Sequence, residues 1–253
     1  MQDLADYFTF LSGYSLGGLS KAARRLRLQR KRGRLALHSP DPAYRQKFVR
    51  LEQALFDAVE HPGQVRLLFG DEVSIYRQPS LGLRWDQQGA EPQARMTAGR
   101  NDCWRIGGAL DAVSGKVTWL ARSNMRLPSL RSFLRLLREQ YPDRGQRLVL
   151  VWDNWPVHHH PEVVAEAAKL GIELLWLPTY APWLNPIEKL WRKLKQTVLH
   201  HHRWSGNWPE LKHQVTAFLD DYSKGSAELL RYVGLLPSEP AQRASRKRRS
   251  RAA

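Results

Sequence analysis

The sequence has little cysteine and no long apolar run, and both absences narrow the class of protein. Its 253 residues include a single cysteine, Cys103, which excludes an internal disulfide and a cysteine-rich zinc site. No run approaches the roughly 18 apolar residues of a membrane-spanning helix. Residues 1–6 are acidic and lack the layout of a secretory signal peptide. We therefore expect a cytoplasmic protein with no membrane partner.

Acidic residues are scarce relative to basic ones. The chain has 40 Lys and Arg residues against 24 Asp and Glu, which gives a formal net charge of +16. Basic side chains near phosphates release condensed counterions, so this excess favours binding to a polyanion. The 42% hydrophobic content is typical of a globular protein with a sizeable core. Composition predicts a nucleic-acid-binding protein of one large domain, alone or with a small appendage.

The basic residues near the N-terminus follow a pattern typical of a helix-turn-helix. Residues 4–11 carry apolar side chains at helical spacing, residues 13–18 contain glycines suited to a turn, and residues 19–26 predict a second, basic helix. Helix, turn and basic helix together favour DNA binding. A solvated helical lead-in to the next domain explains the same pattern equally well.

The remainder of the chain predicts an α/β fold. Strands are expected at 65–70, 104–110, 116–120, 148–152 and 172–177. Helices are expected at 44–60, 130–141, 161–170 and 186–200. The inward face of the first of these helices is predicted to comprise Phe48, Leu51, Leu55 and Val59. Antiparallel strands followed by alternating helix and strand indicate a mixed sheet flanked by helices.

Two aspartates stand directly after predicted buried strands. Asp71 follows the strand at 65–70, and Asp153 follows the strand at 148–152. Open α/β sheets place their chemistry at the carboxyl ends of strands, but an aspartate that closes a strand and begins a turn is also common. In a protein that binds a polyanion, paired carboxylates would repel the ligand unless a divalent cation neutralised them. The pattern predicts either a metal-dependent site or two turn residues.

Glu188, at the start of a predicted helix, has two interpretations. The segment 185–188 fits a capping box, in which Asn185 caps the helix and Glu188 binds the backbone of its own first turn. Alternatively, Glu188, Arg192 and Lys195 lie on one helix face, which suits a metal ligand beside a phosphate-binding track. Spacing alone does not choose between them.

Longer motifs around these residues resemble one known family. Residues 148–154, His158 and residues 177–191 resemble the IS630 branch of the IS630/Tc1/mariner transposases, and residues 68–72 resemble the segment that carries that family's first catalytic aspartate. The 34 residues between Asp153 and Glu188 match the family's spacing. The resemblance covers roughly residues 15–225. It implies an RNase H-like catalytic domain, a mixed sheet flanked by helices, preceded by a partial helix-turn-helix.

The resemblance implies that Asp71, Asp153 and Glu188 are the catalytic residues and metal ligands. They would hold two Mg²⁺ ions, with Mn²⁺ able to substitute, and Asp71 would serve both ions. Such a site cleaves DNA at transposon ends and joins the 3′-hydroxyl to target DNA by phosphoryl transfer. The implied partners are the terminal inverted repeats of the transposon, a target DNA with the sequence TA, and a second copy of the chain. The protein would be bacterial, cytoplasmic and nucleoid-associated when bound to DNA.

The resemblance also divides the chain. Residues 1–45 correspond to part of a helix-turn-helix region, 46–62 to a linker helix, 63–232 to the catalytic domain and 233–253 to a basic, disordered tail. The residues expected to contact DNA are Lys21, Arg24, Arg25, Arg30, Lys31, Arg32, His158, Arg192 and Lys195. Family members have a longer N-terminal part. Two alternatives to an active transposase therefore stand: a catalytically idle DNA-binding remnant or regulator, and a nuclease that hydrolyses DNA without joining it.

Glu72 and the two histidine triplets have mainly structural interpretations, whereas Trp183 has a functional one. Glu72 would point to the opposite side of a continuing strand from Asp71. The histidine triplets at 158–160 and 200–202 fit no familiar zinc motif, because consecutive residues of one element do not all face one ion. Trp183 is predicted to be exposed enough to stack on a nucleobase.

Overall fold

The computed structural model describes residues 14–27, 38–83, 87–89 and 93–237. The chain divides into two compact units, residues 1–37 and 38–253. In the first unit the described residues form the helix α2 (Leu16–Arg25), which Ser15 caps by accepting a hydrogen bond from the amide of Gly18. This helix overlaps the predicted second helix at 19–26 but begins at Leu16, inside the predicted turn at 13–18, whereas the predicted helix at 4–11 lies outside the described residues.

The second unit is built on a five-stranded sheet with the order β3-β2-β1-β4-β5. The strands are β1 (Val65–Tyr76), β2 (Cys103–Asp111), β3 (Val117–Arg122), β4 (Arg147–Trp152) and β5 (Ile172–Trp176). β1 pairs antiparallel with β2, and β2 antiparallel with β3. β4 pairs parallel with both β1 and β5. The predicted mixed sheet is therefore confirmed, and its five strands are the five expected segments.

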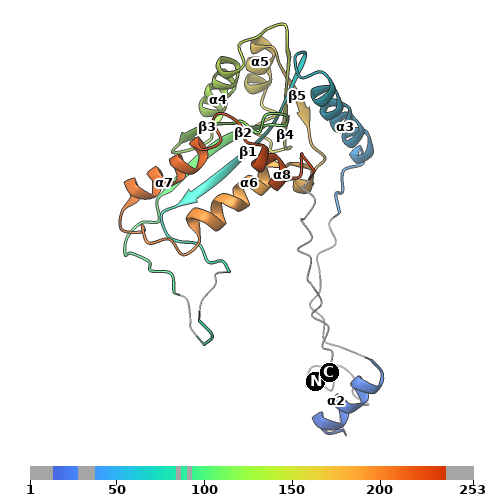
Figure 1. Cartoon of the computed structure of the whole chain (residues 1–253), viewed down its shortest axis with the longest axis vertical. Helices are drawn as coiled ribbons and strands as arrows, with labels where there is room; N and C mark the ends of the chain where they lie inside the picture. Colours follow the sequence, from blue (N-terminus) through green and yellow to red (C-terminus); the bar gives the residue numbers. More distant parts are fainter. Residues whose placement is uncertain (1–13, 28–37, 84–86, 90–92, 238–253) are drawn as a thin grey trace, which may run out of the picture. The chain divides into compact units, whose positions relative to one another are not determined.

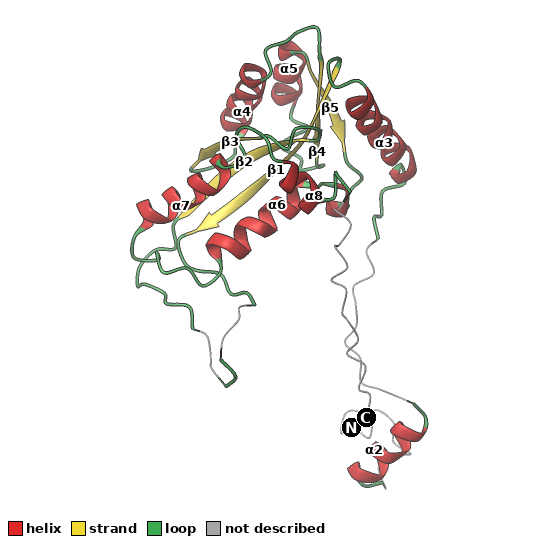
Figure 2. Cartoon of the chain, viewed as in Figure 1, coloured by secondary structure: helices red, strands yellow, loops and turns green. Residues whose placement is uncertain are grey.

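Helices cover both faces of the sheet, as Figures 1 and 2 show. The helices are α3 (Tyr44–Glu60), α4 (Leu127–Gln140), α5 (Pro161–Leu170), α6 (Ile187–Leu194), α7 (Trp208–Asp220) and α8 (Ala227–Val233). α4 and α5 share one hydrophobic core with one face of the sheet. α3, α6, α7 and α8 share a second core with the opposite face. Among the described helices, none has the length and apolar character needed to cross a bilayer.

The alternation of side chains along β1 and β4 decides which residues meet α6. Odd-numbered apolar residues of both strands are buried in the core that contains α6; they are Val65, Leu67, Phe69, Val73, Ile75, Val149 and Val151. Even-numbered residues point into the core under α4 and α5; they are Leu68, Leu148, Leu150 and Trp152. Because side chains of a strand alternate between faces, Asp71 and Asp153 continue the odd-numbered series on the α6 side.

Two predicted boundaries are wrong by six residues each. β1 does not end at residue 70, because its second half pairs with β2 as far as the Tyr76–Cys103 pair. Asp71 therefore lies in the middle of a strand and not at its end. The helix predicted at 186–200 is regular only over α6, and a π-helical turn follows at Lys195–Leu199. A π-turn widens the helix by one residue and is frequent at functional sites.

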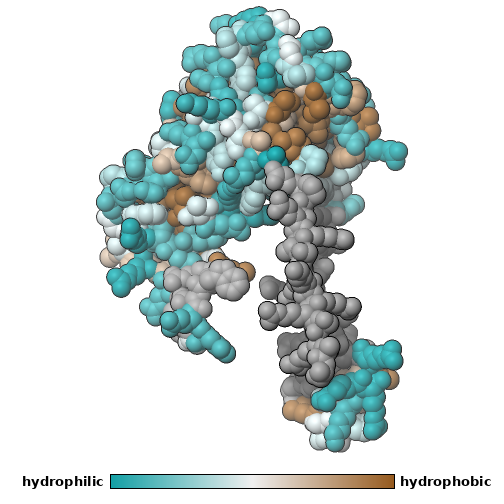
Figure 3. All heavy atoms as spheres, viewed as in Figure 1, coloured by the Kyte–Doolittle hydropathy of each residue, from teal (hydrophilic) through white to brown (hydrophobic). Residues whose placement is uncertain are grey.

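The helix α3, predicted as a linker, belongs to the second unit. Asp41, just before α3, accepts a hydrogen bond from the Thr179 amide (2.9 Å) and pairs with Lys47 of α3 (2.8 Å). Its predicted inward face is partly confirmed: Leu51 is buried and Leu55 packs against the core, whereas Val59 is 54% exposed and Ala54 and Ala58 are buried instead. Small alanines face the sheet because they allow close approach. Figure 3 shows apolar side chains gathered on the surface near α3.

Candidate active site

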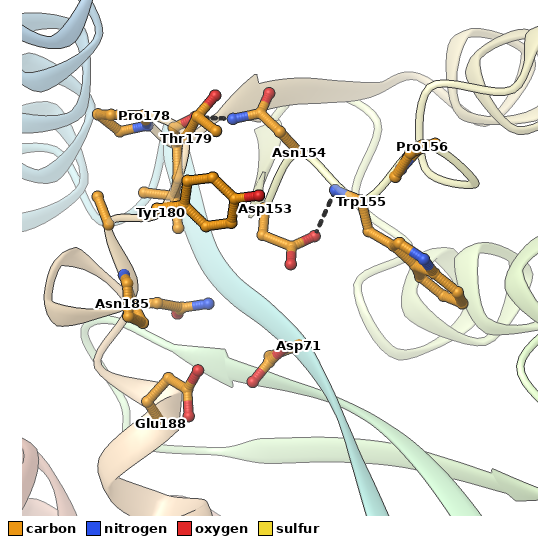
Figure 4. Close-up of a pocket in the computed structure, with 13 residues that line it drawn as sticks. Asp71, Asp153, Asn154, Trp155, Pro156, Pro178, Thr179, Tyr180, Asn185 and Glu188 are labelled. Carbon is orange, nitrogen blue, oxygen red and sulfur yellow. Dashed lines mark hydrogen bonds between the residues drawn. The ribbon is translucent and has the colours of Figure 1, made fainter. Parts of the chain in front are cut away.

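The register of the parallel strands places Asp71 and Asp153 beside each other. Phe69 of β1 pairs with Val151 of β4, so two residues further along both chains Asp71 lies abreast of Asp153. Asp153 directly follows β4, as predicted. Both side chains point to the α6 side of the sheet, and Figure 4 shows them directed toward a common cavity. The fold thus brings together two carboxylates separated by 81 residues.

Two side chains attach α6 to β1 on either side of Glu188. Asn185, just before the helix, donates a hydrogen bond from Nδ2 to the Gly70 carbonyl oxygen (2.9 Å). Trp191, one turn after Glu188, donates from Nε1 to Asp71 Oδ2 (2.9 Å). Both hydrogen bonds hold the first turn of α6 against the middle of β1. Glu188 consequently faces the same cavity as the two aspartates (Figure 4).

The capping-box interpretation of Glu188 is wrong. Pro186 occupies the cap position of α6, and no side chain of the described residues caps the first turn. The amide group of Asn185 is instead used in the contact with Gly70. Glu188 therefore faces the cavity. The remaining interpretation is that Glu188 is a metal ligand beside a phosphate-binding track of Arg192 and Lys195.

Gly108 on β2 makes room for the indole of Trp191. Gly108 is the ladder partner of Asp71, and a Cβ atom added there would lie 2.6 Å from Cη2 of Trp191. The bare backbone at Gly108 lets the ring lie flat enough over the sheet to reach the carboxylate. Trp191 is 2% exposed, so it belongs to the core as well as to the site.

The carboxylates line a cavity of about 560 Å³. Its wall consists of Asp71, Asp153, Asn154, Trp155, Pro156, Leu177, Pro178, Thr179, Tyr180, Ala181, Pro182, Asn185 and Glu188. Tyr180 on the rim is 77% exposed and has a left-handed backbone (φ 53°), which is unusual for a residue other than glycine. Trp155 is 41% exposed, and nearby Trp183, predicted to be exposed, is 37% exposed. Acidic groups thus stand at the floor of a cavity with an aromatic rim.

The three carboxylates are not electrostatically equivalent. Burial first, and then repulsion from Glu188 and Glu72, raise the pKa of Asp71 to about 8. Burial also raises the pKa of Glu188; Lys195 opposes this rise and Asp153 adds to it. Burial alone would raise the pKa of Asp153, but hydrogen bonds from His158 and the Trp155 amide outweigh it and lower that pKa. Of the three carboxylates, only Asp153 has a lowered pKa, so the cavity favours the ionised form of Asp153 and disfavours that of Asp71 and Glu188.

His158 is a buried partner of carboxylates, and its predicted contact with DNA is wrong. Its side chain is 0% exposed, so no phosphate can reach it. Nδ1 lies 2.8 Å from Asp153 Oδ1 and Nε2 lies 3.1 Å from Glu72 Oε1. Burial alone would lower the pKa of His158, but its hydrogen bonds to Asp153 and Glu72 raise it to about 9. His158 is therefore an imidazolium that positions Asp153.

Glu72 lies on the face of β1 opposite to Asp71, as expected from strand alternation. Its partner is His158, whereas the partner of Asp71 is Trp191. The aromatic ring of Trp152 stacks on the imidazole of His158 with 3.8 Å between ring centroids. Glu72 and Trp152 thus hold the buried His158, which in turn contacts Asp153. The sequence signal that predicted His158 was a family motif, which indicated importance but not burial.

The other predicted DNA-contacting residues fall into three groups. Arg192 and Lys195 are exposed, and both act on the pKa of Glu188. Lys21, Arg24 and Arg25 are exposed on α2 in the first unit. The remaining predicted contacts, Arg30, Lys31 and Arg32, lie outside the described residues. Lys195 also lines a second hollow of about 470 Å³, which shares Asp71 and Glu188 with the first.

The second histidine triplet holds a loop in place. Ser80 Oγ lies 2.9 Å from His200 Nδ1, and the amide of His201 donates to the Ser80 carbonyl oxygen (2.9 Å). His201 Nε2 lies 2.7 Å from the carbonyl oxygen of Gly82. The triplet thus joins the chain after β1 to the end of the π-turn. Across the described ranges, no three histidine, cysteine or acidic side chains lie close enough to enclose one ion as they stand.

The donor set of the cavity nevertheless fits hard divalent cations such as Mg²⁺ or Mn²⁺. Asp71, Asp153 and Glu188 supply carboxylate oxygens, the donors that such ions prefer. The Asn185 Oδ1 atom is buried and has no hydrogen-bond partner among the described residues. The pKa of Asp71 is raised to about 8 by burial first and then by repulsion from Glu188 and Glu72, and a bound cation would relieve that repulsion. Each ion would retain positions for water or phosphate oxygen, as Mg²⁺ usually does.

Comparison with solved structures identifies the fold as RNase H-like. The Mos1 transposase paired-end complex with the left transposon end matches with a TM-score of 0.62 and 17% identity, covering 93% of this chain and 70% of that one. The catalytic domain of Mos1 mariner transposase matches with a TM-score of 0.52 and 17% identity, covering 80% of this chain and 93% of that one. The mixed sheet with helices on both faces is therefore that of the Mos1 catalytic domain.

The chain belongs to the DDE superfamily endonucleases, whose family pattern matches residues 66–211. It is also 29% identical over 197 residues to the insertion element IS630 uncharacterized 39 kDa protein of Shigella sonnei. The match covers 76% of this chain and 55% of that protein, so the chain spans about half the length of this curated relative. The resemblance to the IS630 branch is thus confirmed.

Proposed function

We propose that this chain is the catalytic part of a DDE transposase, which cleaves DNA at transposon ends and joins the 3′-hydroxyl to target DNA. The observation that carries the proposal is the convergence of Asp71, Asp153 and Glu188 on one cavity from β1, the end of β4 and α6. Family membership supports the chemistry, because the matched residues 66–211 include all three carboxylates. A reaction at phosphorus by water or a hydroxyl requires no covalent protein–DNA intermediate.

Asp71, Asp153 and Glu188 would hold two divalent cations, Mg²⁺ or Mn²⁺. When bound, the two ions would stabilise the attacking and the leaving oxygens of the displacement at phosphorus. Solved Mos1 complexes include one with Mn and one with Mg. Asp71 has a central position, because it is the residue whose pKa is raised by the charge of both Glu188 and Asp153.

The protein's own groups would position these carboxylates and the DNA. Trp191 fixes one oxygen of Asp71, and His158 with the Trp155 amide keeps Asp153 ionised. Arg192 and Lys195 present positive charge beside Glu188, where a DNA backbone would otherwise be repelled. Tyr180, Trp155 and Trp183 offer exposed rings on which unstacked bases could lie.

The partners proposed for this chain are the terminal inverted repeats of its transposon, target DNA with the sequence TA, and a second copy of itself. Mos1 transposase has been solved in a paired-end complex and in a strand transfer complex. Joining two transposon ends to one target requires two active sites near each other, which a homodimer on DNA provides. The exposed Lys21, Arg24 and Arg25 of α2 are the proposed contacts to transposon-end DNA.

The proposal is tested by strand transfer with purified protein. A pre-cut fluorescent DNA end and a TA-rich plasmid are incubated with Mg²⁺ or Mn²⁺. Wild type is compared with Asp153→Ala and Glu188→Ala, and Glu173→Ala, a carboxylate on the far end of β5, is the matched control. We expect joined product with wild type and control, dependent on metal, and none with either site variant.

Each other outcome has a definite meaning. Hydrolysis of DNA without joined product would indicate a nuclease. DNA binding without cutting or joining, unchanged by Asp153→Ala or Glu188→Ala, would mean that the carboxylates are structural and that the chain is a DNA-binding remnant or regulator.

A further inference from the structure

Asn185 carries an oxygen atom that the fold buries and leaves without a partner. The residue is 4% exposed, yet its Oδ1 accepts no hydrogen bond from the described part of the chain. Burying a polar group without a partner costs about 1–3 kcal/mol. Asn185 lines the cavity together with the three carboxylates (Figure 4). A buried oxygen without a partner, beside a cavity lined by carboxylates, indicates that a bound ligand is its partner.

The orientation of the amide group follows from its other contact. Nδ2 donates to the Gly70 carbonyl oxygen at 2.9 Å. If the amide were rotated by half a turn, Oδ1 would face that carbonyl, and two acceptors would repel each other. The hydrogen bond therefore turns Oδ1 away from Gly70. Gly70 is the residue before Asp71 on β1, and Asn185 lies one helical turn before Glu188 of α6. Asn185 Oδ1 therefore lies where β1 and α6 meet, close to both carboxylates.

The surroundings of Asn185 Oδ1 favour a cation over a hydrogen-bond donor from the protein as its partner. With a cation bound, the carboxylates that line the cavity, Asp71, Asp153 and Glu188, are ionised and act only as hydrogen-bond acceptors. The amide oxygen of Asn185 would add an uncharged metal ligand to three carboxylates that repel one another. Amide oxygens are ordinary ligands of hard divalent cations.

We propose that Asn185 Oδ1 is a fourth oxygen donor of the divalent-cation site, in addition to Asp71, Asp153 and Glu188. This inference rests on the proposed function, because it takes the carboxylate cavity as the place where Mg²⁺ or Mn²⁺ binds. Asn185 then has two roles: its nitrogen attaches α6 to β1, and its oxygen completes the cation site. Its lack of charge adds a ligand without adding repulsion.

Two substitutions separate the roles of the nitrogen and the oxygen. Asn185→Ala removes both the donor to Gly70 and the cavity oxygen. Asn185→Asp also removes the donor, but it keeps an oxygen directed at the cavity. Asn207→Ala is the matched control, because Asn207 caps the start of α7 (its side chain accepts from the Glu210 amide at 3.1 Å) and does not line the cavity.

The experiment measures Mn²⁺ binding to the whole chain by isothermal titration calorimetry, with no DNA present, and records the melting temperature of each metal-free variant. We expect Asn185→Ala to weaken Mn²⁺ binding by roughly 10- to 100-fold, as other losses around metal sites do. Asn185→Asp should retain most of the affinity, although both variants melt earlier than wild type. Asn207→Ala should bind Mn²⁺ as wild type does.

Equal loss of Mn²⁺ affinity in Asn185→Ala and Asn185→Asp would overturn the inference, because the nitrogen would then carry the whole effect. Unchanged affinity in Asn185→Ala would overturn it as well. Asp153→Ala distinguishes these results from failure of the proposed function. If wild type binds no Mn²⁺, or binds it equally with Asp153→Ala, the carboxylate cavity is not a cation site and the proposed function fails first.

Discussion

The indole Nε1 of Trp191 donates a hydrogen bond to Oδ2 of Asp71 at 2.9 Å. This contact joins a core residue of α6 to a carboxylate on the central strand. Since Glu188 lies one helical turn before Trp191, the same helix face that packs on the sheet also carries a second carboxylate to the cavity. Packing of α6 and geometry of the site are therefore coupled, and changes beneath the indole should affect both.

Gly108→Ala should disturb the site without touching a carboxylate. The new Cβ would lie 2.6 Å from Trp191 Cη2, so the rigid ring must move away from Asp71. Overpacking of this kind lowers the free energy of unfolding by about 1–3 kcal/mol. Strand-transfer activity should fall as well. Urea denaturation and strand transfer measure the two effects. Gly63→Ala, where a Cβ meets nothing within 4 Å, is the control and should change neither.

Asp71→Asn should stabilise the metal-free protein while abolishing activity. The pKa of Asp71 is raised from 3.8 to about 8, first by burial and then by repulsion from Glu188 and Glu72. Between these two values the folded chain holds a proton that the unfolded chain has lost, so the free energy of unfolding falls as pH rises. Asparagine has no such proton. The advantage of the variant, measured by urea denaturation in EDTA, should grow from pH 4 to pH 8.

One outcome for Asp71→Asn would contradict this prediction. If Asp71→Asn is less stable than wild type by the same amount at pH 5 and pH 8, the carboxylate is not strained by its neighbours. Added Mn²⁺ should stabilise wild type more than the variant, because a cation relieves repulsion that the variant lacks.

His158→Gln should destabilise the protein most at low pH. The pKa of His158 is raised from 6.5 to about 9: burial opposes this rise, and hydrogen bonds to Asp153 and Glu72 outweigh burial. Stabilisation from a raised imidazole pKa is fully present below pH 6.5 and is lost as pH rises through about 9. The wild-type advantage should be on the order of 3 kcal/mol at pH 6 and should shrink by pH 9.5, as measured by chemical denaturation.

A control for His158 is available on α7. His213 is 71% exposed and lies 3.7 Å from Glu210. His213→Gln shows what the same replacement does at an exposed position. A wild-type advantage over His158→Gln that stays constant from pH 6 to pH 9.5 would contradict the ion-pair interpretation and leave only packing against Trp152.

Lys195→Gln should weaken DNA binding through loss of one phosphate contact. Lys195 is exposed and lines the hollow that shares Glu188 with the active-site cavity. Loss of one such contact reduces the slope of log affinity against log salt by about 1. Fluorescence anisotropy with labelled DNA over a salt series measures this slope. Lys169→Gln, an exposed lysine near the end of α5, is the matched charge control; an equal change in both would point to net charge alone.

Local patterns predicted much of this molecule. The spacing of apolar residues located five strands and the helices α3, α4 and α5, and the expected limits of α5, 161–170, are those observed. Asp153 and Glu188 were found from motif and spacing. These properties depend on neighbouring residues, so a sequence read in one dimension contains them.

Contacts between distant residues decided the rest. Asp71 seemed to end a strand because pairing with β2, more than thirty residues away, is invisible along the chain. His158 was predicted to contact DNA because a motif shows that a residue matters and not what covers it; Glu72, Asp153 and Trp152 enclose it. Asn185 was predicted as a cap, but the Gly70 carbonyl competes for its amide group. The sequence by itself determined the elements and the residue types of the site, whereas only the tertiary structure decided burial, partners and protonation, since these depend on packing between elements.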